Sequence, residues 1–225
     1  MIRMEDFKIK GIKHKTLKDT IYSTLKDIIL NDGFPSDDYI NEQSLATQLN
    51  VSRTPLREAM YDLINEDLIE FRPRKGYRLK QHSNEEVKQI FLLRAIIEKG
   101  IKDPLFENVW SHDVQKLKNI IDDQKQAMEE NNSYHFMQLD KEFHRNMFMI
   151  AKYNIFLKSY DVFHNLTILI GSKAITKQGR MKDVIQEHLD IVETIETNNK
   201  ASFEEKIDKH LSMTLEALGS IDYLS

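Results

Sequence analysis

The sequence predicts a mainly α-helical protein. An N-terminal winged helix-turn-helix, made of three helices and a β-hairpin wing, precedes an all-α antiparallel helical bundle. Three of the four prolines lie before residue 75, so short elements should come first and long helices after them. Apolar residues recur at helical spacing along most of the chain, but the period changes to two over residues 69–79. The expected domains are 1–80, with 1–15 as a flexible extension, and 83–225.

Composition restricts the class of protein. The chain has 225 residues, of which 40% are hydrophobic, and a formal net charge of −4. It contains no cysteine, which excludes disulfides and thiolate metal sites. No apolar run approaches the roughly 20 residues needed to span a bilayer, and the charged N-terminus does not resemble a signal peptide. We therefore expect a soluble, cytoplasmic protein without a membrane partner.

Three helices are predicted before the hairpin. Apolar residues follow helical spacing over 17–29, and a second, short helix follows Asn41. A tight turn over residues 50–52 separates it from a third helix, which begins at Ser52 or Thr54, since either can cap its N-terminus. Two helices joined by such a turn, with a hairpin after them, are typical of a winged helix-turn-helix.

Cationic side chains lie where this fold meets DNA. Arg53 and Arg57 are four residues apart and share a face of the third helix, away from its apolar stripe. The start of a recognition helix enters the major groove, where arginine binds guanine or phosphate. At the tip of the hairpin, Arg74 and Lys75 would flank a backbone or minor groove, and Gly76 permits close approach. A single arginine is more often ordinary solvated surface, but the combination predicts binding to double-stranded DNA.

Nearly all of the chain beyond residue 83 is predicted to be helical. Ser83 and Glu86 form a capping box that opens a long helix. Breaks are expected near residues 103–104, 110–111, 131–133, 153–154, 177–179 and 198–200, which gives about six segments. A bundle of long helices with short connections follows.

Ionisable side chains interrupt the apolar stripes of four of these helices. Asp140 and His144 lie one turn apart on one helix, and His188 and His210 lie on two others. Burying such groups is costly unless they are paired or bound to metal. One carboxylate and three imidazoles suit zinc, nickel, manganese or iron, and leave positions open for water or a ligand. Arg94, on a fourth helix, would hold a carboxylate of an effector.

Taken one at a time, the same residues have simpler explanations. A lone inward histidine is usually a hydrogen-bonded core residue. Asp140 could pair with a neighbouring cation, and Arg94 could pair with Glu98, one turn along. His164 can also face inward, and no role is predicted for it. From spacing alone, the metal site and these structural roles both stay open.

The N-terminal part resembles a known family. Val51-Ser52-Arg53-Thr54-Pro55-Leu56-Arg57-Glu58-Ala59 is similar to the signature of GntR regulators, and Asn41-Glu42-Gln43-Ser44-Leu45-Ala46 fits as well. The resemblance extends from Leu17 to Leu79. It implies contacts with DNA from Ser52, Arg53, Thr54, Arg57 and Gly76. Some members carry an arginine where Gln43 stands, so Gln43 is a further candidate for a phosphate or base contact.

The remainder resembles the ligand-binding FCD domain of the FadR-type branch of that family. Asp140-Lys141-Glu142-Phe143-His144, Glu187-His188 and Lys209-His210 carry this resemblance, which covers residues 83 to 220. It implies that Asp140, His144, His188 and His210 bind a divalent metal, with a small organic acid held at it. The expected protein is a homodimeric repressor that binds a palindromic operator. Effector binding would alter the bundle and so the spacing of the two wings.

Two alternatives remain. A cluster of Asp and His with open positions is also a catalytic metal site, but it would need a general base. Glu142 and Glu187 adjoin the ligands in sequence, yet each residue turns the helix by about 100°, and the chain has no nucleophile motif. The other alternative is a purely structural metal in a protein that binds DNA constitutively.

Overall fold

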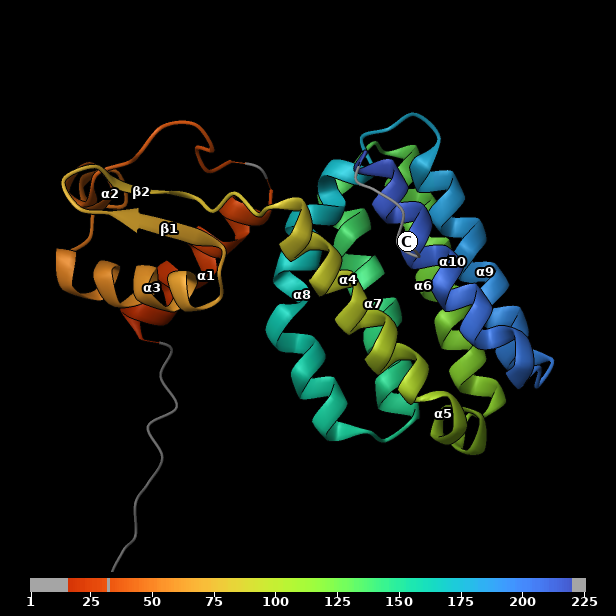
Figure 1. Cartoon of the computed structure of the whole chain (residues 1–225). Helices are drawn as coiled ribbons and strands as arrows, with labels where there is room; N and C mark the ends of the chain where they lie inside the picture. The colour runs from red at the N-terminus through yellow and green to blue at the C-terminus, as the bar shows by residue number, and fades with distance from the viewer. Residues whose placement is uncertain (1–15, 32, 220–225) are drawn as a thin grey trace, which may run out of the picture.

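The computed structural model describes residues 16–31 and 33–219; the extension expected at residues 1–15 lies outside them. The first part contains α1 (Leu17–Leu30), α2 (Glu42–Gln48), α3 (Arg53–Asn65), β1 (Ile69–Arg72) and β2 (Gly76–Leu79). The second contains α4 (Asn84–Gly100), α5 (Lys102–Asn108), α6 (Ser111–Glu129), α7 (Ser133–Ile150), α8 (Asn154–Ala174), α9 (Arg180–Glu196) and α10 (Lys200–Ala217). The predicted winged helix-turn-helix followed by a helical bundle is confirmed (Figure 1).

The winged domain has its own apolar core. Thr16 caps α1, and Asp19 completes the capping box. Leu25 on α1 and Met60 on α3 are almost fully buried where these helices pack together. Ser52 is the N-cap of α3, but its side chain makes no capping hydrogen bond. The first backbone N–H groups of α3 therefore keep their capacity to bind an anion.

The wing is a two-stranded antiparallel hairpin in which Ile69 pairs with Leu79. An isolated bridge joins Tyr77 to Ile40, with N···O distances of 2.8 and 2.9 Å in the two directions. At the tip, Lys75 N donates to Arg72 O over 3.1 Å, and Arg74 has a φ of 68°. A positive φ in a tight turn normally favours glycine or asparagine, so the basic tip holds Arg74 in a strained conformation.

Seven helices form the bundle within the described residues, rather than about six. The six expected breaks already divide the region into seven segments. The first break lies at Ile101 instead of residues 103–104, and Pro104 falls in the first turn of α5, where a missing N–H costs little. Ser83 and Glu86 form the predicted capping box of α4. Helix α6 packs against both α7 and α9, α10 packs on α9 and α4, and α8 lies against α7 and α4 (Figure 1). None of the described helices is long and apolar enough to cross a membrane.

Contacts centred on Glu66 join the two parts. Glu66 follows α3 and accepts hydrogen bonds from Tyr22 and, over 2.8 Å, from Lys26, both on α1. From the bundle, Asn165 Nδ2 of α8 donates to Glu66 Oε2 over 2.9 Å, and Asn165 is only 5% exposed. A change in the position of α8 would therefore act directly on the end of α3.

Candidate DNA and metal sites

Six of the eight predicted DNA-contacting residues line one groove between α3 and the wing: Gln43, Arg53, Arg57, Arg74, Lys75 and Gly76. The side chains of Arg53 and Arg57 are 55% and 62% exposed. Ser52 and Thr54 lie at the start of α3, beside this groove. The structure thus brings the predicted residues together on one surface. Their contacts with DNA remain predictions.

Glu42 organises this groove, and sequence reasoning did not identify it. Arg53 Nε donates to Glu42 Oε1 over 2.6 Å, and Arg57 binds both carboxylate oxygens, at 2.7 and 3.0 Å. The hydrogen bond from Arg57 is the largest cause of a lowered pKa at Glu42. Bidentate pairing fixes the direction of a guanidinium, so Glu42 orients the two cations that face the groove.

Gly76 has a structural explanation besides the predicted DNA contact. It is buried and its φ is 115°. A Cβ at this position would lie 2.1 Å from the Ile40 carbonyl oxygen, a contact that real Cβ atoms essentially never show. Any side chain at residue 76 would therefore break the bridge between the wing and the segment before α2. This packing requires glycine at residue 76, and the contact of Gly76 with DNA stays a prediction.

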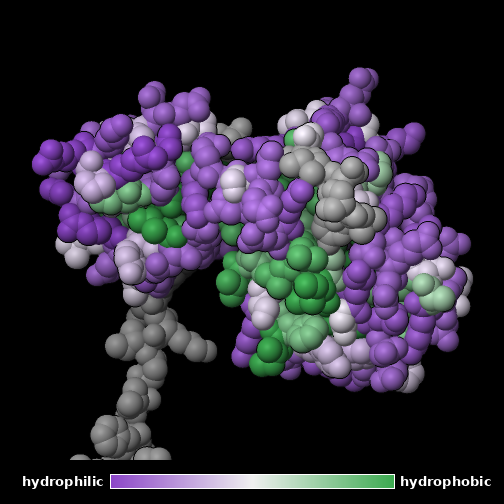
Figure 2. Space-filling model, viewed as in Figure 1, coloured by the Kyte–Doolittle hydropathy of each residue, from purple (hydrophilic) through white to green (hydrophobic). Residues whose placement is uncertain are grey.

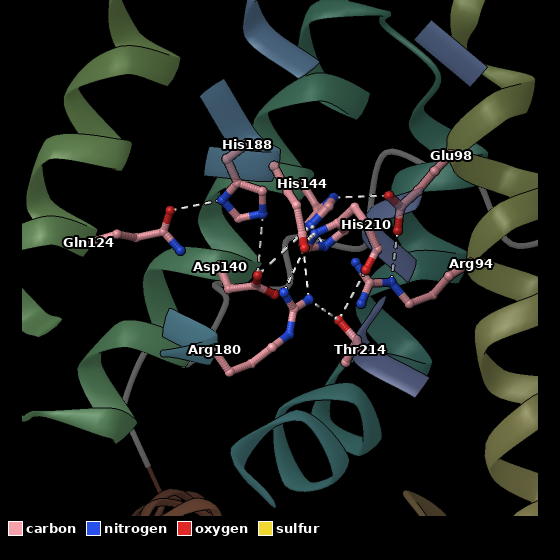
Figure 3. Close-up of polar contacts among 10 residues, drawn as sticks. Arg94, Glu98, Gln124, Asp140, His144, Arg180, His188, His210 and Thr214 are labelled. Atoms are coloured by element: carbon pink, nitrogen blue, oxygen red, sulfur yellow. Dashed lines mark hydrogen bonds and ion pairs between the residues drawn. The ribbon is translucent and has the colours of Figure 1, made fainter. Parts of the chain in front are cut away.

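The four predicted metal ligands converge in the bundle core (Figure 3). Asp140 and His144 project from α7, His188 from α9 and His210 from α10. Each offers one ligand atom, and the four atoms lie within 4.8 Å of one another. His144 Nε2 is 3.2 Å from His210 Nε2, and His188 Nε2 is 3.5 Å from Asp140 Oδ1. All four residues are at most 4% exposed.

A side-chain oxygen lies within 2.9 Å of the outer nitrogen of every imidazole. His144 Nδ1 lies 2.9 Å from Glu98 Oε2, and His188 Nδ1 lies 2.8 Å from Gln124 Oε1. His210 Nδ1 lies 2.8 Å from Glu187 Oε2. The same carboxylate, Glu187, is bound by Arg180 through hydrogen bonds of 2.6 and 2.9 Å. Acceptors at Nδ1 keep the proton there, as they do around metal-bound histidines.

The inner nitrogens then fit a cation. With each proton on Nδ1, each Nε2 presents a lone pair, and those of His144 and His210 face each other with no proton between them. Within the described part of the chain, His188 Nε2 has no hydrogen-bond partner although it is fully buried. A divalent ion bound by Asp140, His144, His188 and His210 would satisfy all of these atoms.

Burial also disfavours charge on the individual ligands. It raises the pKa of Asp140 and lowers the pKa values of His188 and His210 well below the ordinary histidine value. His188 and His210 are therefore neutral, which is the form that binds metal. Burial alone would raise the pKa of Glu98, but Arg94 and His144 outweigh it and lower that pKa to about 2. Glu98 is thus ionised beside the cluster.

Arg94 takes part in both of the arrangements considered from the sequence. Its Nε donates to Glu98 Oε1 over 2.8 Å, as the pairing alternative expected. Its Nη2 is buried and, among the described residues, has no hydrogen-bond partner. A small cavity of about 10 Å³ lies between Arg94, Asp140, Thr167 and His210. Arg94 therefore retains a free donor next to the metal ligands.

Sequence reasoning missed the outer partners Gln124, Glu187 and Arg180. Gln124 interrupts the apolar stripe of α6, between Ile121 and Ala127, and this signal could have identified it. Helical geometry turns Glu187 about 100° from His188, but Glu187 is buried and meets His210 of the next helix. Its role depends on how α9 and α10 pack, and no spacing within α9 reveals it.

Comparisons with known proteins find a matching family for the winged domain and another for the bundle. Residues 17–79 match the bacterial regulatory proteins of the gntR family, and residues 89–213 match the FCD domain. The uncharacterized HTH-type transcriptional regulator YdhC of Bacillus subtilis is 25% identical over 96% of each chain. The HTH-type transcriptional repressor RspR of Escherichia coli is 23% identical, over 81% of this chain and 80% of its own.

Solved structures share the fold at low identity. Escherichia coli McbR/YncC aligns with a TM-score of 0.74 and 15% identity, covering 91% of this chain and 97% of its own. A GntR transcriptional regulator from Rhodococcus sp. RHA1 aligns with a TM-score of 0.76 and 16% identity, covering 91% and 99%. The family consists of transcriptional regulators and not enzymes, which sets the catalytic alternative aside. This chain belongs to the GntR family of bacterial transcriptional regulators and carries an FCD domain as its C-terminal part.

Proposed function

We propose that the protein is a repressor whose bundle, residues 83–225, binds a divalent metal and a small carboxylic acid and thereby controls DNA binding by residues 1–80. The observation that carries this proposal is the buried cluster of Asp140, His144, His188 and His210. Zinc, nickel and manganese are the candidate ions, because all accept imidazole together with carboxylate. The repressor assignment follows the name of the Escherichia coli relative.

The free donor of Arg94 favours a sensing role over a purely structural metal. A bound ion would supply positive charge and open coordination positions for a ligand carboxylate. Arg94 lines the same cavity, and its unpaired Nη2 would bind the carboxylate as well. The cavity of about 10 Å³ holds about one water molecule, so an acid enters only if a helix lining it moves. Helix α8 contributes Thr167 and Gly171 to that lining.

Movement of α8 supplies the link to DNA. Asn165 of α8 binds Glu66 at the end of α3, and α3 begins with Arg53 in the groove described above. A shift of α8 would pull on Glu66 or release it, and so change the orientation of the winged domain relative to the bundle. A ligand changes such an equilibrium only by binding one arrangement more tightly than the other.

The test is a titration of operator binding by fluorescence anisotropy, with metal-loaded protein and operator DNA selected from a random pool. Adding small mono- and dicarboxylates should weaken DNA binding by about 5- to 150-fold, the usual range of coupling between two sites. The Asp140→Ala/His188→Ala variant should bind the operator but fail to respond. DNA affinity that stays the same with every acid would reject effector control and favour the structural metal.

A second copy of the chain is the proposed partner of an apolar surface on the bundle. Leu92, Leu93 and Ile96 of α4 and Ile155 and Val162 of α8 are 42–72% exposed. The space-filling view shows apolar residues gathered on this face of the bundle (Figure 2). Helices α4 and α8 pack side by side, so the two sets form one apolar strip. A palindromic operator needs two recognition helices related by twofold symmetry, and this strip can supply the contact.

The dimer is tested by light scattering on size-exclusion chromatography. Ile96→Glu/Val162→Glu should convert a dimer of about twice 26.5 kDa into a monomer, because it places like charges in the centre of the contact. Met149→Glu, on the exposed side of α7, is the matched control and should leave the dimer intact. A double variant that remains dimeric would place the contact elsewhere.

A further inference from the structure

Three buried polar side chains on α8 make no hydrogen bond in the site described so far. Tyr160, His164 and Thr167 follow one another at intervals of four and three residues, so they share one face of the helix. They are 0%, 0% and 1% exposed. Tyr160 Oη, both ring nitrogens of His164 and Thr167 Oγ1 have no hydrogen-bond partner among the described residues. We call these three residues the α8 polar stripe.

Such a stripe reduces the stability of the protein. Buried polar groups in folded proteins are nearly always hydrogen-bonded, because leaving them unpaired forfeits their hydration. Phe and Val have almost the same shapes as Tyr and Thr and would fill the same space without this cost. Four unpaired atoms on one helix face therefore indicate that something other than the protein binds there.

The α8 polar stripe continues the proposed effector site. Thr167 borders the cavity together with Arg94 and the metal ligands Asp140 and His210. Tyr160 and His164 form the end of the stripe away from Thr167, and their ring centroids are 4.6 Å apart. Burial lowers the pKa of His164 well below its ordinary value, and the nearby charge of Arg94 lowers it further. His164 is neutral and offers one donor and one acceptor.

We propose that the α8 polar stripe binds hydroxyl or carbonyl oxygens of the effector, whose carboxylate lies at the metal and Arg94. This inference rests on the proposed function and narrows its ligand class. From Tyr160 to Thr167 the helix rises by about 10 Å, so the stripe reaches past a two- or three-carbon acid. The ligand is a polyhydroxylated carboxylic acid of about five or six carbons, not an aliphatic or aromatic acid.

The experiment compares acids that differ only in hydroxyl groups, by calorimetry on metal-loaded protein. Galactarate should bind at least about 100-fold more tightly than adipate, because a site with polar groups rejects a ligand that leaves them unpaired. Malate and succinate, which are shorter, should differ less. Tyr160→Phe and Thr167→Val should each reduce the preference for galactarate about tenfold or more. Tyr153→Phe and Thr176→Val, at exposed positions just before and just after α8, are the matched controls.

The outcomes separate this inference from the proposed function. Equal binding of galactarate and adipate, or tighter binding of adipate, would overturn the hydroxyl-binding role while leaving a carboxylate sensor in place. Binding of neither acid would count against the proposed function itself. Thermal melting without ligand gives an independent measurement: Tyr160→Phe and Thr167→Val should melt at the same or a higher temperature than the parent. A clear drop in either variant would mean that the hydroxyl is needed for folding, and would also overturn the inference.

Discussion

Purified protein is expected to contain close to one divalent ion per chain, and the Asp140→Ala/His188→Ala variant to contain none. The double variant removes the carboxylate and one of three imidazoles. Loss of a partner behind a ligand already weakens metal affinity about 10- to 100-fold, so loss of two ligands should exceed that. Elemental analysis of tag-free protein, after incubation with zinc, nickel or manganese and gel filtration, measures the difference.

Two further measurements make this result specific. His135→Ala/Glu142→Ala removes one imidazole and one carboxylate from exposed positions of the same helix, α7, and should retain the ion. Chelation should lower the melting temperature of the parent protein, because an ion at 100 times its Kd stabilises the folded state by about 2.7 kcal/mol. It should leave the melting temperature of the double variant unchanged. A parent protein that binds none of the three ions would remove the metal from the sensing mechanism, while the DNA-binding prediction would stand.

Removal of Arg53 and Arg57 should abolish tight operator binding. Each arginine is expected to contribute about 1–3 kcal/mol, so Arg53→Ala/Arg57→Ala should lower affinity by at least about 30-fold. If both bind phosphate, the slope of log affinity against log salt should fall by about two. If they bind bases, the slope should change little and discrimination between operator and random DNA should fall instead. Anisotropy titrations at several salt concentrations distinguish the two.

Folding and overall charge need a control in this experiment. Lys116→Ala/Lys182→Ala removes two positive charges from exposed positions on the bundle and should keep operator affinity within a few-fold of the parent. Circular dichroism should show both double variants folded, since surface substitutions usually change stability by no more than about 0.5 kcal/mol. Equal losses in both double variants would mean that general charge, and not the groove, holds the DNA.

Local patterns predicted most of the fold and the inner part of the metal site. Asp140 and His144 lie one turn apart on α7, and this spacing alone places both side chains on the inner face. Glu42 was missed because its partners Arg53 and Arg57 lie on another helix, 11 and 15 residues away. Contacts of this kind arise from packing between helices, which periodicity within one helix does not describe.

Gly76 also shows that local sequence patterns do not reveal contacts between separate elements. The sequence identified Gly76 as a place for close approach, but what approaches it is the Ile40 carbonyl of its own chain. The predicted contact with DNA and the packing inside the domain require the same absence of a side chain. The coordinates of Ile40 establish the packing inside the domain and leave the contact with DNA a prediction.

The contact between Asn165 and Glu66 has a consequence for how the regulator would be used. Asn165 directly follows His164 of the α8 polar stripe, so one short segment of α8 faces both the proposed effector and the DNA-binding domain. Thermodynamic linkage is reciprocal: if the acid weakens operator binding by a given factor, the operator weakens acid binding by the same factor. DNA and metabolite would then compete without sharing an atom. Protein bound to its operator would respond only at a higher acid concentration than protein free in the cell. Operator binding would therefore help to set the acid concentration at which the repressor is released.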